Sequence, residues 1–174
     1  MNEKRRPGPR LVFALSGLGK STLAALHPEA VFDADVLLYR AVEAGFSELE
    51  PRARLRAWRA LCRERPWTVS GERFERWVRV RRTLVESFRR EVLEGAWTLV
   101  LTSWLEGPCT IDVHYGVTRG RYLEHLRCVG RSADNAQDEA MNDKLEGYSP
   151  VLRLEPGSYL AEQPAIADLL GAEG

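Results

Sequence analysis

A lysine followed by two hydroxyl side chains stands in a glycine-rich stretch near the start of the chain, Ser16–Gly17–Leu18–Gly19–Lys20–Ser21–Thr22. Gly19, Lys20 and Ser21 match the end of the Walker A pattern GxxxxGK[ST], and Ala14 stands where that pattern has its first glycine. In the pattern, backbone N–H groups surround a phosphate, the lysine contacts the β and γ phosphates, and the hydroxyl binds Mg²⁺. We therefore expect residues 16–22 to hold a nucleotide phosphate and Ser21 to bind the metal. The alternative is a strand–turn–helix corner with accidental glycines.

Two carboxylates follow the next apolar run. Asp33 and Asp35 come after residues 30–32, and no apolar run in the chain ends in an obvious Walker B aspartate. In a parallel sheet, the carboxyl ends of the strands form the ligand-binding edge. Asp33 is therefore a candidate to hold Mg²⁺ through water or to accept a proton from an acceptor hydroxyl. Asp35 is a candidate for substrate binding, and the alternative is that it caps a helix starting at Val36.

Four arginines recur through one predicted helix in the second half of the chain: Arg119, Arg121, Arg127 and Arg131. Arg127 and Arg131 are four residues apart and so would share one face of that helix. Arginines on a closing lid stabilise the negative charge that develops on a transferred phosphate. We expect Arg127 and Arg131 to contact the transferring group, and Arg119 and Arg121 to bind substrate. The alternative is a solvated basic face.

A strongly basic segment lies in the first half of the chain. Residues 51–90 hold thirteen arginines and four glutamates, a net charge of +9, although the whole chain has a formal net charge of zero. Arginine next to aromatic side chains can hold a phosphate and stack a base, and also binds single-stranded nucleic acid. The alternative is that the aromatic residues are core and the arginines surface. The aromatic residues are Trp58, Trp67, Phe74, Trp77 and Phe88.

Short apolar runs alternate with helical patterns along the chain, which predicts an α/β protein with a mostly parallel five-stranded sheet and helices on both faces. The expected strands are residues 11–15, 30–32, 97–101, 110–115 and 151–154. The expected helices are residues 21–26, 36–45, 52–65, 70–95, 120–145 with an interruption near Gly130, and 159–170. The helix over 70–95 has Ser70 as its expected cap and one apolar stripe, Trp77, Val80, Leu84, Phe88 and Val92.

Length and composition indicate one ordinary globular domain. The 174 residues suit a single domain over 11–174 after a flexible tail at 1–10, and the chain is 44% hydrophobic and 29% charged. No apolar run approaches the roughly 18 residues that span a bilayer, and no signal-peptide pattern is present. We therefore expect a cytoplasmic protein with no membrane partner. Three cysteines without CxxC spacing argue against a disulfide framework and a structural zinc site.

The chain resembles the small P-loop kinases of the nucleoside monophosphate kinase type, in particular the compact versions of bacteriophages and some bacteria. The resemblance lies in residues 16–22, 31–35, 121–127 with Arg131, and 152–160. These look like the phosphate loop, the acidic turn on the acceptor side, the lid helix and the last strand with its base-side loop. The resemblance implies a P-loop three-layer sandwich that uses ATP and Mg²⁺. It also implies a helical insert at 52–94 that binds the acceptor and a lid at about 116–146.

The expected activity is the transfer of the γ-phosphate of ATP to a (deoxy)nucleoside monophosphate or a related nucleotide. Lys20 and the loop amides would hold the phosphates, and Asp33 the acceptor or a metal-bound water. One alternative is a kinase of hydroxymethylated pyrimidines within phage DNA, which would dock on residues 52–90. Another is a nucleotide-binding switch or partner module with little transfer activity. The protein is expected to be a monomer or homodimer, in the host cytoplasm if a phage encodes it.

Overall fold

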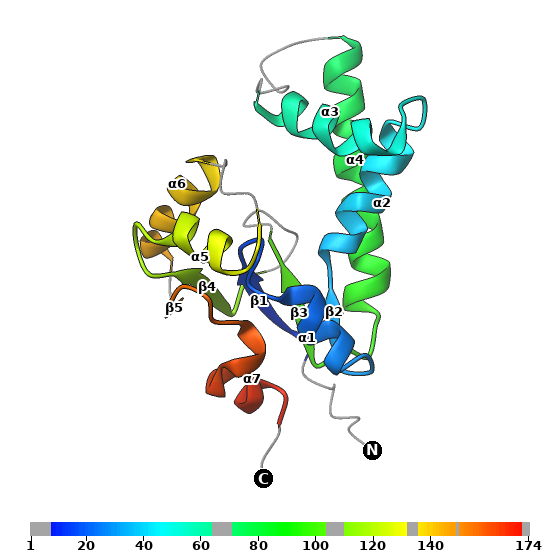
Figure 1. Cartoon of the computed structure of the whole chain (residues 1–174). Coiled ribbons are helices and arrows are strands. Elements are labelled where there is room, and N and C mark those ends of the chain that lie inside the picture. Colours follow the sequence, from blue (N-terminus) through cyan, green and yellow to red (C-terminus); the bar gives the residue numbers. More distant parts are fainter. Residues whose placement is uncertain (1–7, 64–70, 104–109, 132–135, 149, 172–174) are drawn as a thin grey trace, which may run out of the picture. The chain divides into compact units, whose positions relative to one another are not determined.

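The computed structural model describes residues 8–63, 71–103, 110–131, 136–148 and 150–171 (Figure 1). The chain forms two compact units, of which the first contains residues 1–33 and 96–174 and the second contains residues 34–95. Most of the tail expected at 1–10 lies outside the described residues, and its last residue, Arg10, already belongs to a strand. None of the described helices is long and apolar enough to cross a bilayer.

The first unit is built on a sheet of five parallel strands in its described part, in the order β2-β3-β1-β4-β5. Val12 in the central strand pairs with Leu101 on one side and with Val113 on the other. The sequence-based expectation of a mixed α/β fold with a parallel five-stranded sheet is confirmed. The strands are β1 (Arg10–Ala14), β2 (Val31–Asp33), β3 (Leu99–Thr102), β4 (Val113–Val117) and β5 (Val151–Leu154).

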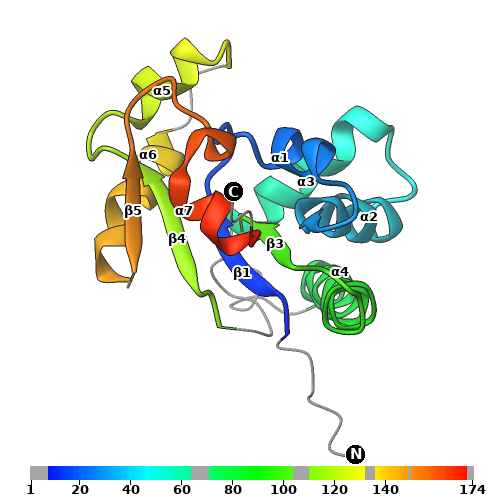
Figure 2. The same cartoon turned by 90° about the horizontal axis from the view of Figure 1, so that it is seen from below.

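Helices of the first unit cover both faces of this sheet (Figure 2). The crossover from β1 to β2 runs in the opposite direction to that from β4 to β5, so right-handed crossovers place their helices on opposite faces. The partners of two neighbouring β4 residues are consistent with helices on both faces. Tyr115 lies near Asp168 on one face, and His114 packs on Tyr148 on the other. The elements are α1 (Lys20–Leu26), α5 (Tyr122–Cys128), α6 (Ala136–Lys144), η3 (Leu145–Gly147), η4 (Leu160–Glu162) and α7 (Pro164–Leu169).

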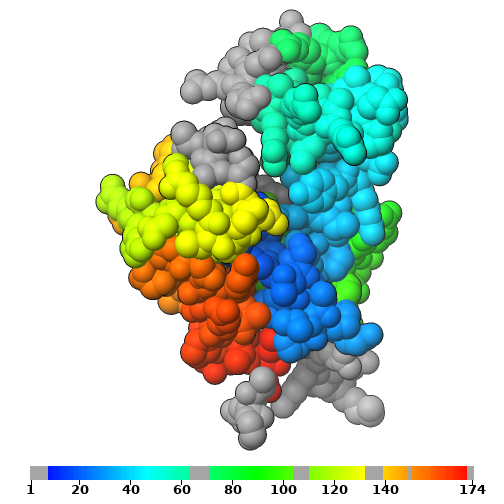
Figure 3. All heavy atoms as spheres, viewed as in Figure 1, coloured from blue at the N-terminus to red at the C-terminus, as the bar shows by residue number. Residues whose placement is uncertain are grey.

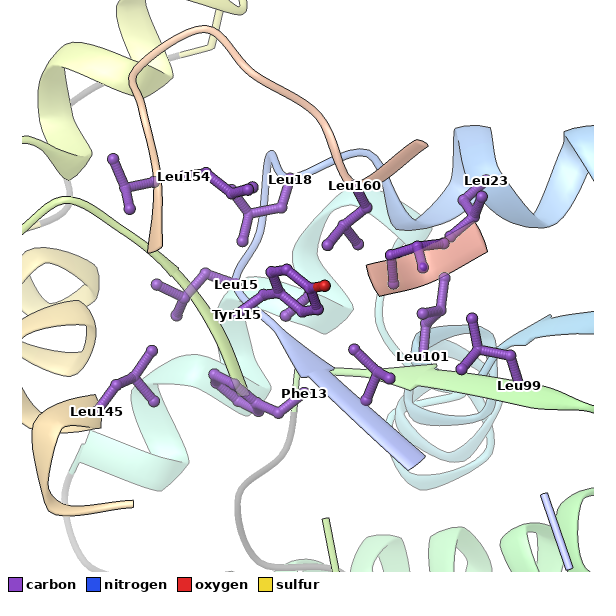
Figure 4. Close-up of a cluster of buried hydrophobic side chains, with 14 of the residues drawn as sticks. Phe13, Leu15, Leu18, Leu23, Leu99, Leu101, Tyr115, Leu145, Leu154 and Leu160 are labelled. Carbon is purple, nitrogen blue, oxygen red and sulfur yellow. The ribbon is translucent and has the colours of Figure 1, made fainter. Parts of the chain in front are cut away.

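The core of the first unit is a cluster of apolar side chains, aliphatic and aromatic, between the sheet and these helices (Figure 4). Phe13 of β1 is fully buried at its centre, together with Tyr115 of β4. Leu18 and Leu23 join the cluster from the loop after β1 and from α1, and Leu160 joins it from η4. The same apolar contacts that stabilise the sheet therefore fix the start and the end of the segment that carries Lys20.

The second unit consists of helices in its described part: α2 (Asp35–Gly45), α3 (Pro51–Arg63), α4 (Glu72–Phe88) and a single π-helical turn η2 (Arg89–Leu93). Four residues of the expected apolar stripe, Val80, Leu84, Phe88 and Val92, are buried, whereas the fifth, Trp77, is only partly buried. The residue before α4 is Gly71, and the expected cap Ser70 lies outside the described residues. At Gly45 the backbone of α2 comes so close to α4 that an added Cβ would lie 2.3 Å from Val80 Cγ2.

We expect Gly45→Ala to lower the free energy of unfolding by about 1–3 kcal/mol, because the new methyl group overpacks the contact with Val80. Chemical denaturation of both proteins measures the effect. Gly147→Ala is the matched control, since its Cβ meets no described atom within 4 Å. Val80→Ala in the Gly45→Ala background should restore part of the loss, and additive effects of the two substitutions would contradict the close contact.

Candidate functional site

The glycine-rich loop, residues 15–19, connects β1 to α1 at the carboxyl edge of the central strand. The connection after β1 leads toward β2 and the one after β4 leads toward β5, on opposite sides of the sheet centre. Ligands of open parallel sheets bind outside the carboxyl ends of the strands at such a switch point. Gly17 and Gly19 have φ angles of 88° and 86°, which L side chains rarely adopt. The loop thus has the position and the backbone shape that an anion-binding loop needs.

Lys20, the first residue of α1, is only 6% exposed. Its Nζ donates hydrogen bonds to the carbonyl oxygens of Ala14 at 2.8 Å and Leu15 at 3.1 Å. A buried ammonium group is tolerated only when it is hydrogen-bonded, and here the end of β1 supplies the acceptors. The side chain therefore folds back over its own loop, with its charge at the carboxyl edge of the sheet.

The hydroxyl group of Ser21 donates a hydrogen bond of 2.9 Å to Oδ2 of Asp33. These residues come from α1 and from the end of β2, and the structure brings together the two expected metal ligands. Hydroxyl and carboxylate oxygens are the donors that Mg²⁺ prefers, and Mg²⁺ is usually bound through one or two protein carboxylates together with phosphates and water. The pair fits that requirement. In the described part of the chain, no cluster of three or more His, Cys, Asp or Glu side chains forms a separate metal centre.

Helix α5 and the residues after it contact the glycine-rich loop at Ser16 and Gly17. The Tyr122 hydroxyl donates to the Ser16 carbonyl at 2.7 Å, and Arg131 Nη1 donates to the Ser16 hydroxyl at 3.0 Å. His125 Nε2 lies 3.2 Å from the Gly17 carbonyl oxygen. The space-filling view shows this yellow segment against the blue segment that contains the loop (Figure 3). The loop is thus restrained by side chains more than a hundred residues away in sequence.

Arg131 reaches the loop by a route that differs from the sequence-based prediction. Helix α5 ends at Cys128, so Arg127 and Arg131 do not share a face of one helix. Gly130 has a φ of 70° and donates to the Arg127 carbonyl, while Arg131 N donates to the Leu126 carbonyl at 2.8 Å. This is a Schellman turn, which ends the helix and redirects the chain. Of the two arginines, Arg131 therefore contacts the loop, and Arg127 is exposed on α5.

Arg119 and Arg121, expected to bind substrate, are both paired with acidic side chains. Arg119 Nη1 lies 3.2 Å from Glu146, and Arg121 donates to Glu124 and to Glu155 at 2.9 Å. Arg121 is the residue before α5 and Arg119 precedes that helix, so neither lies within the expected single helix. Their contacts connect α5 to η3 and to the segment after β5, which is a positioning role in this structure.

Asp35 is not the N-cap of α2. The helix begins at Asp35 itself, and Ala34 is the capping residue without a side-chain hydrogen bond. An acidic residue in the first turn still interacts favourably with the helix dipole. Asp35 belongs to the second unit and Asp33 to the first, so the substrate role expected for Asp35 stays a prediction.

The turn after β5 supports the loop from its other side. The Leu160 amide donates to the Leu18 carbonyl at 3.0 Å, and a Cβ on Gly19 would lie 3.0 Å from the ring of Tyr159. Sequence reasoning missed these supports because each is an isolated polar or aromatic residue without a motif. The only available signals were the helical spacing and the Pro–Gly turn close to them. The missed residues are Tyr122, His125 and Tyr159.

Comparison of the chain with known protein families, with curated proteins and with solved structures finds no match.

We expect Gly19→Ala to destabilise the protein more than Gly120→Ala. Both glycines have positive φ, 86° and 70°, so both substitutions share the backbone cost of about 1–2 kcal/mol. Only Gly19 faces a close side chain, the ring of Tyr159, whereas a Cβ on Gly120 meets no described atom within 4 Å. Urea unfolding measures both changes, and equal losses of stability would show that Tyr159 does not restrict the loop.

Proposed function

We propose that the protein is an ATP- and Mg²⁺-dependent phosphotransferase of the P-loop class that acts on a (deoxy)nucleoside monophosphate or a related nucleotide. The observation that carries the proposal is the hydrogen bond between Ser21 and Asp33 beside the buried Lys20, at the carboxyl edge of β1 and β2. A strand–turn–helix corner with accidental glycines would not need a carboxylate from another strand on the hydroxyl that follows the lysine. The parallel sheet supports the class, because P-loops stand between such a strand and a helix.

The loop amides and Lys20 would hold the phosphates of ATP. Lys20 now donates to two neutral carbonyl oxygens, and a phosphate oxygen would add the attraction between opposite charges that these acceptors lack. The side chain is therefore held at the loop until a better acceptor arrives. Gly17 and Gly19 allow the backbone to approach the phosphates closely, since they carry no side chain.

Ser21 and Asp33 would hold Mg²⁺. Bound there, the ion would neutralise charge on the phosphate oxygens and orient the transferred group. Of the two roles expected for Asp33, the bond to Ser21 favours the one at the metal over that of a base for the acceptor hydroxyl. Arg131 is the candidate to stabilise charge on the transferred phosphate, because it already contacts the loop at Ser16.

Lys20→Ala should abolish transfer of γ-labelled phosphate from Mg·ATP, because the phosphates lose their buried cation. The assay offers ribo- and deoxynucleoside monophosphates as acceptors, together with oligonucleotides that carry plain or hydroxymethylated pyrimidines. Lys144→Ala removes an exposed lysine from α6 and is the matched control. Thermal unfolding of each variant separates loss of activity from loss of the fold.

Label in a nucleoside diphosphate would support the proposal and identify the base. Label in free phosphate alone would favour a nucleotide-binding switch, and retained transfer in Lys20→Ala would refute the mechanism. An unchanged melting temperature of the wild-type protein with millimolar Mg·ATP would remove the nucleotide site altogether.

A second candidate acceptor is a hydroxymethylated pyrimidine within single-stranded DNA, and the surface of α4 favours it. A groove on this helix is lined by Phe74, Glu75, Val78, Arg79 and Arg82. Phe74 and Val78 are 37% and 38% exposed, so apolar surface lies open to solvent beside the arginines of the groove. Single-stranded nucleic acid is bound by this combination of stacking surfaces and cations.

If DNA docks on α4, substitution of Arg79 and Arg82 by Gln should weaken oligonucleotide binding and flatten its dependence on salt. Each lost phosphate contact lowers the slope of log K against log salt by about 0.7 for a single strand. Arg119→Gln, at an exposed ion pair of the first unit, is the control. Fluorescence anisotropy at several salt concentrations measures both quantities, and identical slopes for all three proteins would exclude this surface.

A further inference from the structure

His125 is a fully buried polar residue that lies between two backbone segments. Its exposure is 0%, its Nε2 is 3.2 Å from the Gly17 carbonyl oxygen, and its Nδ1 is 3.1 Å from the Gly157 amide nitrogen. The Gly157 amide can only donate, so Nδ1 must carry the lone pair. The neutral ring then carries its proton on Nε2 and donates it to Gly17. One side chain thus bonds both to the glycine-rich loop and to the turn after β5.

The hydrogen bond from His125 to Gly17 determines the direction in which the Gly17 carbonyl points. In a trans peptide, the carbonyl group and the following N–H point in opposite directions. The Ser16 and Gly17 carbonyls accept hydrogen bonds from Tyr122 and His125 of α5. The amides of Gly17 and Leu18 must therefore point away from α5. Within the loop, the Leu18 amide donates to the Leu15 carbonyl at 3.4 Å, so what the bond from His125 controls is the Gly17 carbonyl oxygen, which an anion repels and which is kept turned toward α5.

We propose that His125 is a positioning residue, which holds the Gly17 carbonyl of the glycine-rich loop toward α5, and so away from a phosphate at the loop, before any ligand arrives. This role rests on the proposed function, because the orientation of the Gly17 peptide affects ligand binding only if the loop binds phosphate. It differs from a packing role, since an aliphatic side chain of similar size would fill the same space without orienting a peptide. Preorganised donors cost no rearrangement when the ligand binds.

The environment of the ring keeps it neutral. Burial lowers the pKa of His125 below its usual value, and the hydrogen bond to Gly17 opposes this only in part. An imidazolium ring would also place a second donor against the Gly157 amide. Glu124, the neighbour of His125 on α5, is paired with Arg121 at the surface, and Arg127 of the same helix is exposed. The donor and the acceptor that the ring needs are thus both present at neutral pH.

Two amide substitutions separate the two hydrogen bonds of His125. A glutamine amide reaches the position of Nε2 and can still donate to Gly17, while an asparagine amide reaches the position of Nδ1 and can still accept from Gly157. Each variant loses one hydrogen bond, and asparagine is also smaller by one methylene group. A packing role therefore predicts a larger loss of stability in His125→Asn, seen in thermal unfolding, but equal affinity of the two folded variants for Mg·ATP. We expect His125→Gln to bind Mg·ATP within about threefold of wild type and His125→Asn to bind it about tenfold more weakly, as measured by calorimetry. Equal losses, or wild-type affinity in His125→Asn, would overturn the proposal.

Spectra of the protein without ligand test the same inference independently of ATP. Nuclear magnetic resonance of the imidazole nitrogens should show Nδ1 unprotonated and Nε2 protonated at pH 7. The amide signals of Gly17 and Gly19 should stay sharp in His125→Gln and broaden in His125→Asn, because the loop then exchanges between conformations. A proton on Nδ1, or identical signals in both variants, would overturn the positioning role. If the spectra are as expected but wild type does not bind Mg·ATP, the proposed function is refuted, while the restraint of the loop by His125 is still supported.

Discussion

The burial of one positive charge determines the local structure of the candidate site. The ammonium group of Lys20 cannot remain out of water without acceptors, and the carbonyl groups at the end of β1 are the ones it uses. To reach them, the chain must reverse direction within the few residues between strand and helix, which requires backbone conformations open to Gly17 and Gly19. The apolar residues on either side, among them Leu15 and Leu18, are buried in the core of the sheet. The position of Lys20 is therefore fixed by the same packing that stabilises the first unit.

The loop is also held by distant parts of the chain. Side chains of α5 and Arg131 hold the carbonyl and hydroxyl groups on one side, and the segment from Gly157 to Leu160 holds the other. His125 bonds to both sides. The contacts that reach the loop itself join residues separated by more than a hundred positions, so the loop can take this form only when β4, α5 and β5 are folded around β1. A local motif therefore needs the tertiary structure of the whole first unit, and loss of a support should alter ligand binding before it alters the fold.

The elements that depend on local pattern were predictable, and those that depend on distant partners were not. The Walker A-like residues and the alternation of apolar runs with helices indicated the strand, the loop and the parallel sheet directly. The expected strand at 110–115 was placed too early, because β4 continues through Gly116 to Val117. Glycine weakens a strand prediction, but here a Cβ would lie 2.6 Å from Arg153 Nη1 and 2.8 Å from Asn142 Oδ1, so a larger residue would displace these hydrogen-bonded side chains. Asn142 pairs with both backbone groups of Val117, a contact that no sequence pattern announces. The interruption expected near Gly130 is present, since α5 ends at Cys128, but the contact of Arg131 with the Ser16 hydroxyl beyond that turn had no sequence signal.

Ion pairs explain part of the surplus of arginine in the basic segment. The net charge of +9 belongs to residues 51–90, but the complete second unit contains fourteen arginines and ten acidic residues, a net charge of +4. Glutamates outside the basic segment account for much of the difference: Glu43 pairs with Arg54, Glu48 with Arg76, and Glu91 with Arg40 and Arg90. Exposed pairs of this kind contribute little stability each, yet they occupy the guanidinium groups that an anion would need. Recognition of an anion by this unit is therefore restricted to a smaller surface than the composition suggests. In the groove of α4, Arg79 lies beside exposed apolar side chains, while Arg82 is paired with Glu86 at 3.9 Å.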